Sequence, residues 1–141
     1  MTATISRPKI SNWETSNIPN LKGKTALITG ANSGLGYFTA KALAEKNAHV
    51  VIACRSIEKA NQTIKKLKGL NPEGLFTPLE LDLSDLKNIV EVQSKIFDNF
   101  EHLDLLINNA GIMHPPKTLS AQGYEIPVSY THLTLPTIYS V

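Results

Sequence analysis

Three glycines, at positions 30, 34 and 36, follow a short apolar run and open a segment with helical periodicity. A strand-to-helix turn presents backbone N–H groups and the positive end of a helix dipole, which together can hold a phosphate. Glycine suits this turn because it adopts tight backbone angles and has no Cβ to block the phosphate. We therefore predict a phosphate-binding glycine loop over residues 29–36, with these binding residues: Gly30, Asn32, Ser33, Gly34, Leu35 and Gly36.

Predicted strands and helices alternate along the rest of the chain. Apolar runs predict strands at residues 23–29, 49–53, 75–81 and 103–107, and amphipathic segments after the first three predict helices. Ser56 and Ser84 are expected to cap the second and third helices. The predicted apolar face of the first helix comprises Leu35, Phe38, Thr39, Ala42 and Leu43. That of the third helix comprises Leu86, Ile89, Val90, Phe97 and Phe100.

This alternation predicts an α/β fold, because right-handed crossovers turn it into a parallel sheet with helices on both faces. The expected structure is the N-terminal part of a doubly wound Rossmann-type domain in three layers, truncated after its fourth strand. Pro78 fits an edge strand, which the third strand is in this strand order. Ligands bind such sheets at the carboxyl ends of the strands, so the glycine loop, Arg55, Asp82 and residues 108–111 are expected to share one site.

The composition limits the classes of function. Apolar residues make up 42% and charged residues 18%, as in a globular chain, and a net charge of +2 gives no case for nucleic acid or an anionic membrane as partner. No apolar run approaches the ~20 residues of a membrane span. A single cysteine favours a reducing, cytoplasmic location. Cys54 is expected to be a small core residue, and no metal site is predicted.

Four motifs in this order resemble the short-chain dehydrogenase/reductase family. They are Thr-Gly-x3-Gly-x-Gly in the glycine loop, Ala53-Cys54-Arg55-Ser56, Leu81-Asp82-Leu83 and Asn108-Asn109-Ala110-Gly111. A flexible Gly/Ser turn alone would not predict the other three. The Ala-Cys-Arg element and the residues that follow Gly111 most resemble the retinol-dehydrogenase-like branch, with protochlorophyllide reductases second. The resemblance implies hydride transfer between a nicotinamide cofactor and a small-molecule alcohol/carbonyl pair.

The resemblance also implies roles for the residues after the strands. An acidic residue after the second strand would favour NAD, whereas Arg55 can pair with a 2′-phosphate, so NADP (NADPH) is the predicted cofactor, with Ser56 beside it. A surface ion pair is the alternative for Arg55. Asp82 and Leu83 are implied to contact the adenine, although Asp82 could instead only precede a helix beside Ser84. The implied ribose-side residues are Asn108, Asn109, Ala110 and Gly111.

The family's catalytic serine and Tyr-x3-Lys pair are implied to follow the region that matches here. Tyr124, Tyr130 and Tyr139 have no lysine four residues later, so no catalytic residue is assigned. We expect this chain to be the cofactor-binding part of a longer enzyme and to be inactive by itself. The resemblance does not determine whether the longer enzyme forms oligomers. A non-catalytic nucleotide-binding sensor or scaffold is the rival from another class; a flavodoxin-type domain is disfavoured by the glycine loop and residues 108–111.

The expected domain division is an N-terminal arm over residues 1–22, a partial NADP-binding domain over 23–126 and a non-native tail over 127–141. Residues 128–137 match, codon by codon, the translation of a transposase-type sequencing adapter, and a genuine β-rich tail is the alternative. If the tail is read-through, the fourth strand is an apolar edge open to aggregation. We then expect a poorly soluble or partly folded product.

Overall fold

The computed structural model describes residues 13–111, 119–120 and 122–123. A 3-10 turn, η1, precedes a regular alternation of strands and helices. In chain order the elements are η1 (Thr15–Asn17), β1 (Thr25–Thr29), α1 (Gly34–Glu45), β2 (His49–Cys54), α2 (Ile57–Leu70), β3 (Leu75–Glu80), α3 (Leu86–Asn99) and β4 (Leu105–Ile107).

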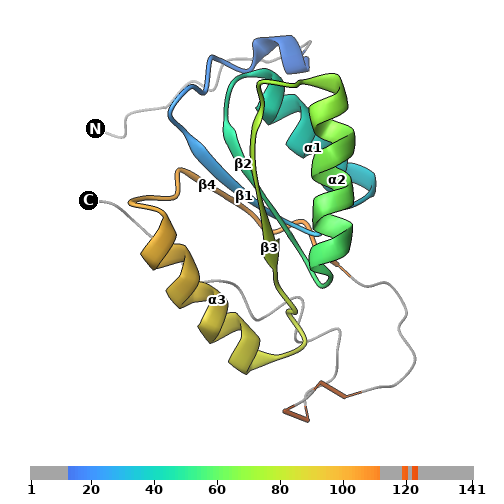
Figure 1. The fold of residues 1–141 in the computed structure, drawn as a ribbon, viewed down its shortest axis with the longest axis vertical. Helices are drawn as coiled ribbons and strands as arrows, with labels where there is room; N and C mark the ends of the chain where they lie inside the picture. The colour runs from blue at the N-terminus through green and yellow to red at the C-terminus, as the bar shows by residue number, and fades with distance from the viewer. Residues whose placement is uncertain (1–12, 112–118, 121, 124–141) are drawn as a thin grey trace, which may run out of the picture.

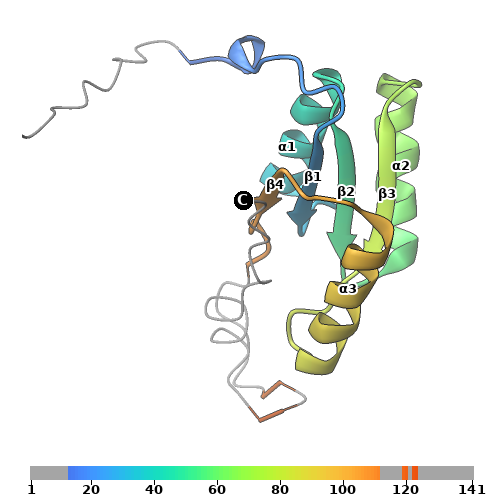
Figure 2. The ribbon, with the colours of Figure 1, turned by 90° about the vertical axis from the view of Figure 1, so that its left-hand side faces the viewer.

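The four strands form one parallel sheet in the order β3-β2-β1-β4. β1 lies in the middle, where it pairs with β2 from Thr25 opposite His49 and with β4 from Ala26 opposite Leu105. Figure 2 shows the strands side by side in this order, with the arrowheads of β1 and β2 pointing the same way. The predicted doubly wound α/β fold is therefore confirmed, and the carboxyl ends of all four strands meet at one edge.

Alternate residues of the strands pack against opposite layers of helices. Ala26, Ile28, Val50 and Ile52 belong to the core cluster that α1 and α2 cover. Leu27, Val51 and Ala53 belong to the cluster beneath α3, as the two-residue period of a strand requires. Figure 1 shows α1 and α2 to the right of the strands and α3 to the lower left. The buried strands β1 and β2 are apolar on both faces because both faces are covered.

The two outer strands behave as their sequences predict. β3 is an edge strand, as Pro78 predicted. Pro78 lies opposite Ile52 and has no backbone N–H to donate, which an edge strand tolerates. Among the described strands β4 is the other edge, and Leu105 on it is 37% exposed. The expected apolar edge is thus present in the described part of the chain.

The predicted apolar face of α1 is wrong except at Leu43. Leu35 and Phe38 are 80% and 64% exposed, and the residues that face the core are Gly36, Ala40, Leu43 and Ala44. The helix is rotated because Gly36 approaches the backbone of the glycine loop, where no larger residue fits. Small residues at positions 36 and 40 let α1 lie close to the sheet, and this close approach outweighs burial of the larger side chains.

Two predictions for α3 also need correction. The residue that caps it is Asp85, whose carboxylate accepts from the Lys87 N–H, while the Ser84 hydroxyl donates to Asp82 Oδ1 at 2.6 Å. The buried residues of α3 are Ile89, Val92 and Ile96, whereas Val90 and Phe97 are exposed. Of the predicted apolar face, Ile89 is therefore buried, and Leu86 and Phe100 pack partly against the core.

Part of the predicted arm contacts the domain. Ile18 and Leu21 pack against the α1–α2 cluster, and the Leu21 N–H donates to the Lys46 carbonyl at 2.7 Å. Trp13, by contrast, is mostly exposed. Residues 1–12 and the predicted tail at 127–141 lie outside the described residues. Within the part that is described, no helix is both long and apolar enough to cross a bilayer.

Candidate nucleotide site

A pocket of about 420 Å³ opens at the carboxyl ends of the strands. All four strands or the loops after them contribute to it, which brings together residues more than eighty positions apart. Nine predicted site residues line it: Gly30, Asn32, Ser33, Leu35, Arg55, Leu83, Asn109, Ala110 and Gly111. The remaining lining residues are Thr29, Ala53, Cys54 and Leu81.

Thr29 and Asn109 join the glycine loop to the turn after β4. The Thr29 hydroxyl accepts from the backbone N–H groups of Asn109 and Ala110, each at 3.0 Å. The Asn109 side chain donates to the carbonyls of Thr29 at 3.0 Å and Gly30 at 3.3 Å. Thr29 is only 2% exposed, so these bonds are shielded from water and hold one wall of the pocket in place.

Two glycines allow this close packing. Gly30 has φ +66°, and a Cβ on it would lie 3.0 Å from Ala110 Cα. A Cβ on Gly36 would lie 2.5 Å from Asn109 Nδ2 and 2.7 Å from the Gly30 carbonyl oxygen. These glycines therefore serve contacts within the protein. At Gly34 (φ +56°) and Gly111, apart from chain neighbours and backbone of the same helix, no atom of the described residues lies within 4 Å of where a Cβ would be.

The N-terminus of α1 is the uncapped one among the three described α-helices. Its N-cap, Ser33, makes no side-chain hydrogen bond, and no described residue accepts from the N–H groups of Gly34, Leu35 and Gly36. Ser56 caps α2 and Asp85 caps α3. Ser33 and Leu35 line the pocket, so free donors and the positive end of the α1 dipole lie beside it. The donor set fits a phosphate or pyrophosphate.

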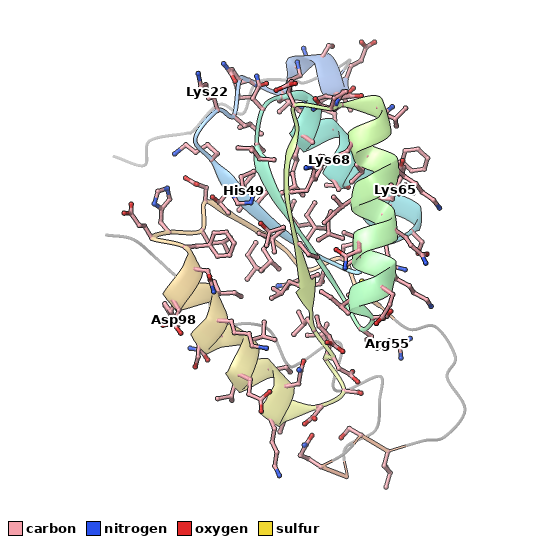
Figure 3. The ribbon with its side chains drawn as sticks, in the orientation of Figure 1. Lys22, His49, Arg55, Lys65, Lys68 and Asp98 are labelled. Carbon is pink, nitrogen blue, oxygen red and sulfur yellow. The ribbon has the colours of Figure 1, made fainter. Side chains whose placement is uncertain are left out.

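Arg55 follows β2 and lines the same pocket. Figure 3 shows it at the lower end of the sheet, far from Lys22 at the upper end. The ion pairs of the described residues are Lys24–Asp104, Lys41–Glu45 and His102–Asp104. Arg55 is in none of them, so the alternative of a surface salt bridge for Arg55 has no carboxylate partner among the described residues. The guanidinium is available to an anion in the pocket.

Five predicted site residues are not among the pocket's lining residues: Gly34, Gly36, Ser56, Asp82 and Asn108. The Ser56 hydroxyl is engaged by α2, since it accepts from the Lys59 N–H and donates to Glu58. That hydroxyl is the leading cause that holds the pKa of Glu58 below its ordinary value. Asp82 Oδ1 accepts from both the backbone and the hydroxyl of Ser84, which is the helix-preceding arrangement considered above. Gly34 and Gly36 remain next to the pocket through Leu35.

Cys54 is buried, as predicted, and it also lines the pocket. The residue is 7% exposed, and its thiol donates to the Ser56 carbonyl at 3.2 Å. Burial raises the pKa of the Cys54 thiol, which disfavours the thiolate needed in a nucleophile. His49, at the other end of the same strand, pairs with the Thr77 hydroxyl at 2.8 Å. No cluster of His, Cys, Asp and Glu suited to a metal occurs among the described residues.

One Tyr-x3-Lys spacing does occur, at Tyr37 and Lys41 on α1. Tyr37 packs against the α1–α2 cluster, and Lys41 pairs with Glu45 at 3.5 Å. Neither residue lines the pocket. The described residues of the pocket can bind and orient a nucleotide, and none of them forms an acid–base pair.

Thr29 begins the predicted glycine loop but was not among the predicted site residues. Its hydroxyl holds both the turn after β4 and, through Asn109, the glycine loop. The sequence did offer a signal for this role, because a threonine at the end of the central strand is expected to be buried and a buried hydroxyl needs hydrogen-bond partners.

The chain belongs to the short-chain dehydrogenase family, whose model matches residues 24–128. It is 38% identical to human retinol dehydrogenase 13 over 113 residues, which cover 80% of this chain and 34% of that protein. The chain spans 31–40% of the length of the first curated relatives that it matches.

Several solved structures of similar sequence share the fold. An uncharacterised protein from Mycobacterium paratuberculosis matches with a TM-score of 0.74 and 36% identity, over 85% of this chain and 41% of that one. A metagenomic short-chain oxidoreductase in complex with NADP matches with 0.61 and 29%, over 66% and 41%. A protein from Haemophilus influenza assigned as a D-mannonate oxidoreductase, with bound NAD, matches with 0.60 and 30%, over 77% and 38%. The relatives are oxidoreductases, so a nicotinamide nucleotide is the ligand class of the family.

Proposed function

We propose that this chain is the NADP-binding part of a short-chain oxidoreductase that interconverts an alcohol and a carbonyl compound, with retinol-dehydrogenase-like specificity in the parent. The observation that carries the proposal is Arg55 in the pocket without a carboxylate partner among the described residues. Solved relatives bind NADP in one case and NAD in another, so membership of the family does not choose between them. A guanidinium without a carboxylate partner beside the adenosine side supports NADP, because it can pair with a 2′-phosphate.

Within this proposal the described residues bind and orient the cofactor, which would supply the hydride. The N–H groups of Gly34, Leu35 and Gly36 hold the pyrophosphate, with Asn32 and Ser33 beside them. Arg55 and Ser56 lie at the ribose phosphate. The adenosine side is formed by Asp82, Leu83, Asn108, Asn109, Ala110 and Gly111.

Turnover is proposed to require a part of the parent that the described pocket does not supply. The chain on its own is then expected to bind NADPH without oxidising it.

The proposed cellular location is the cytoplasm, because a single cysteine is typical of a protein in a reducing compartment. Fractionation of cells that contain the tagged parent protein tests this location. Residues 1–22 and 23–126 remain the proposed arm and domain.

The cofactor test compares NADPH and NADH binding to the chain and to two variants by calorimetry. Arg55→Asp replaces the guanidinium with a carboxylate, and Lys65→Asp makes the same charge change on the outer side of α2, as Figure 3 shows. We expect Arg55→Asp to weaken NADPH at least about tenfold while NADH changes little, since a charged hydrogen bond is worth about 1.5–3 kcal/mol. Lys65→Asp should preserve the ratio. Equal losses in both variants, or no NADPH preference in the unmodified chain, would overturn the NADP assignment.

The proposed read-through origin of residues 127–141 has a separate test. Sequencing the source locus past the codon for Ile126 should reveal a different continuation. A locus that encodes residues 128–137 as they stand would contradict it and would favour the sensor or scaffold alternative if the chain also binds NADPH.

A further inference from the structure

Gln122 makes a two-point contact with the start of α3. Its Nε2 donates to Asp85 Oδ1 at 2.8 Å, and its Oε1 accepts from the Leu86 N–H at 3.0 Å. The side chain reaches this position from a turn closed by the Gly123 N–H on the Ser120 carbonyl at 2.9 Å. Residues 36 and 37 positions apart in the sequence are thereby joined through partly buried hydrogen bonds.

These contacts complete the cap of α3. Asp85 Oδ1 accepts from the Lys87 N–H as well, so the first two N–H groups of the helix are both bonded. The Gln122 amide, followed by the Lys87 N–H, holds the pKa of Asp85 below its ordinary value. The start of α3 is thus closed by a side chain from a distant segment, whereas the start of α1 is open beside the pocket.

The first turn of α3 in turn holds the loop that lines the pocket. Asn88 Oδ1 accepts from the Asp82 N–H at 2.8 Å, and the Asp85 N–H donates to the Asp82 carbonyl at 3.2 Å. Leu83, between these contacts, is 6% exposed and forms a wall of the pocket. A continuous path of hydrogen bonds therefore runs from Gln122 through the start of α3 to the pocket wall.

We propose that Gln122 is a positioning residue for the cofactor site: it ties the segment after β4 to the start of α3 and thereby fixes the Asp82–Leu83 wall against which the adenosine half of the nucleotide binds. This inference rests on the proposed function and extends it. Gln122 touches no lining residue of the pocket in these contacts, so it acts through Asp85 and Leu86.

Gln122→Leu tests the proposal, since leucine is similar in size and can neither donate nor accept. Gln62→Leu, the same change on the exposed side of α2, is the matched control. We expect Gln122→Leu to weaken NADPH and NADH by the same factor, about fivefold, as for the loss of about one net hydrogen bond. A constant NADPH/NADH ratio separates this positioning role from that of Arg55. Hydrogen exchange of the Leu86 and Asp82 amides should also accelerate in Gln122→Leu alone.

Gln122→Glu adds a readout that general loss of stability would not move. Its carboxylate can accept from Leu86 but repels Asp85, with Asp82 as a further acidic group in the loop and Lys87 as the basic group of the same turn. At about pH 5 a proton shared between the two carboxyl groups can restore the donated bond. Nucleotide binding by Gln122→Glu should therefore improve from pH 8 to about pH 5 relative to the unmodified chain.

Binding and amide exchange in Gln122→Leu that equal those of Gln62→Leu would overturn the proposal, as would a pH profile of Gln122→Glu parallel to that of the unmodified chain. An unmodified chain that binds neither nucleotide would instead refute the proposed function. Amide exchange at Leu86 and Asp82 would then still decide whether Gln122 holds the wall. If Gln122→Leu fails to fold, the pH profile of Gln122→Glu decides.

Discussion

The hydroxyl of Thr29 accepts from the backbone N–H of Asn109 at 3.0 Å, and the Asn109 side chain returns a hydrogen bond to the Thr29 carbonyl at the same distance. These two residues are eighty positions apart, at the ends of neighbouring parallel strands. Their reciprocal contact joins the glycine loop to the turn after β4. The geometry of this side of the pocket therefore depends on the contact between Thr29 and Asn109.

Replacement of Thr29 by valine should test this pair. Valine keeps the shape but removes the acceptor for two partly buried N–H groups, so we expect a loss of about 2 kcal/mol in the free energy of unfolding. Thr63→Val is the control, because Thr63 is also buried but its hydroxyl only donates to the Lys59 carbonyl inside α2. Urea denaturation followed by circular dichroism measures both. Equal midpoints for the two variants would contradict the role of Thr29.

Alanine substitutions at Gly36 and Gly69 should have opposite effects on stability. Both glycines lie in helices, where alanine is intrinsically favoured by about 1 kcal/mol. At Gly69 the added Cβ meets no atom of the described residues within 4 Å beyond its chain neighbours and the backbone of its own helix, so Gly69→Ala should stabilise the chain. At Gly36 it meets Asn109 Nδ2 and the Gly30 carbonyl, so Gly36→Ala should destabilise it by about 1–3 kcal/mol. A stabilising Gly36→Ala would show that α1 can move away from the loop at little cost.

Stability should decrease as the pH falls below about 6.5, the ordinary pKa of histidine. Burial lowers the pKa of His49 in the folded chain, where the ring lies 5.6 Å from that of Phe100. A lowered folded-state pKa means that the unfolded state binds the proton first, so stability is complete above the unfolded pKa and is lost as the pH falls through the folded one. The lowered pKa values of Asp85 and Asp104 act in a more acidic range. Denaturation midpoints between pH 7.5 and 5.5 should fall in the unmodified chain and change less in His49→Gln.

Removal of Asp104 should cost more than removal of its lysine partner. Asp104 accepts from the Thr25 N–H and from Lys24 Nζ, both at 2.8 Å, and Lys24 leads the causes that hold the pKa of Asp104 low. Lys24 is 55% exposed, so Lys24→Ala should cost about 0.5 kcal/mol or less. Asp104→Ala also leaves the Thr25 N–H at the start of β1 without its acceptor and should cost about 1–2 kcal/mol. Raised salt should reduce the cost of Lys24→Ala more than the cost of Asp104→Ala. A larger cost for Lys24→Ala than for Asp104→Ala would show that the ion pair, and not the bond to the Thr25 N–H, provides the stabilisation.

Much of the fold could be predicted because local patterns and topology agree. Apolar runs located the strands, Pro78 located an edge, and right-handed crossovers placed the glycine loop, Arg55 and residues 109–111 around one pocket. Each of these depends on chain order and period, which the sequence states directly. The family motifs are strong for the same reason: they mark the carboxyl ends of successive strands.

Helix rotation and side-chain partners were decided by the tertiary structure. Leu35 and Phe38 are larger and more apolar than Gly36 and Ala40, yet the small residues face the sheet because α1 must approach the loop and Asn109 closely. Ser84 would cap a helix that began one residue earlier, but Asp82 engages its hydroxyl. Gln122 carries no local signal at all, since its partners Asp85 and Leu86 come within reach only after the chain returns past β4. Composition and period determine which segments form strands and helices; steric fit between distant segments determines which atoms meet.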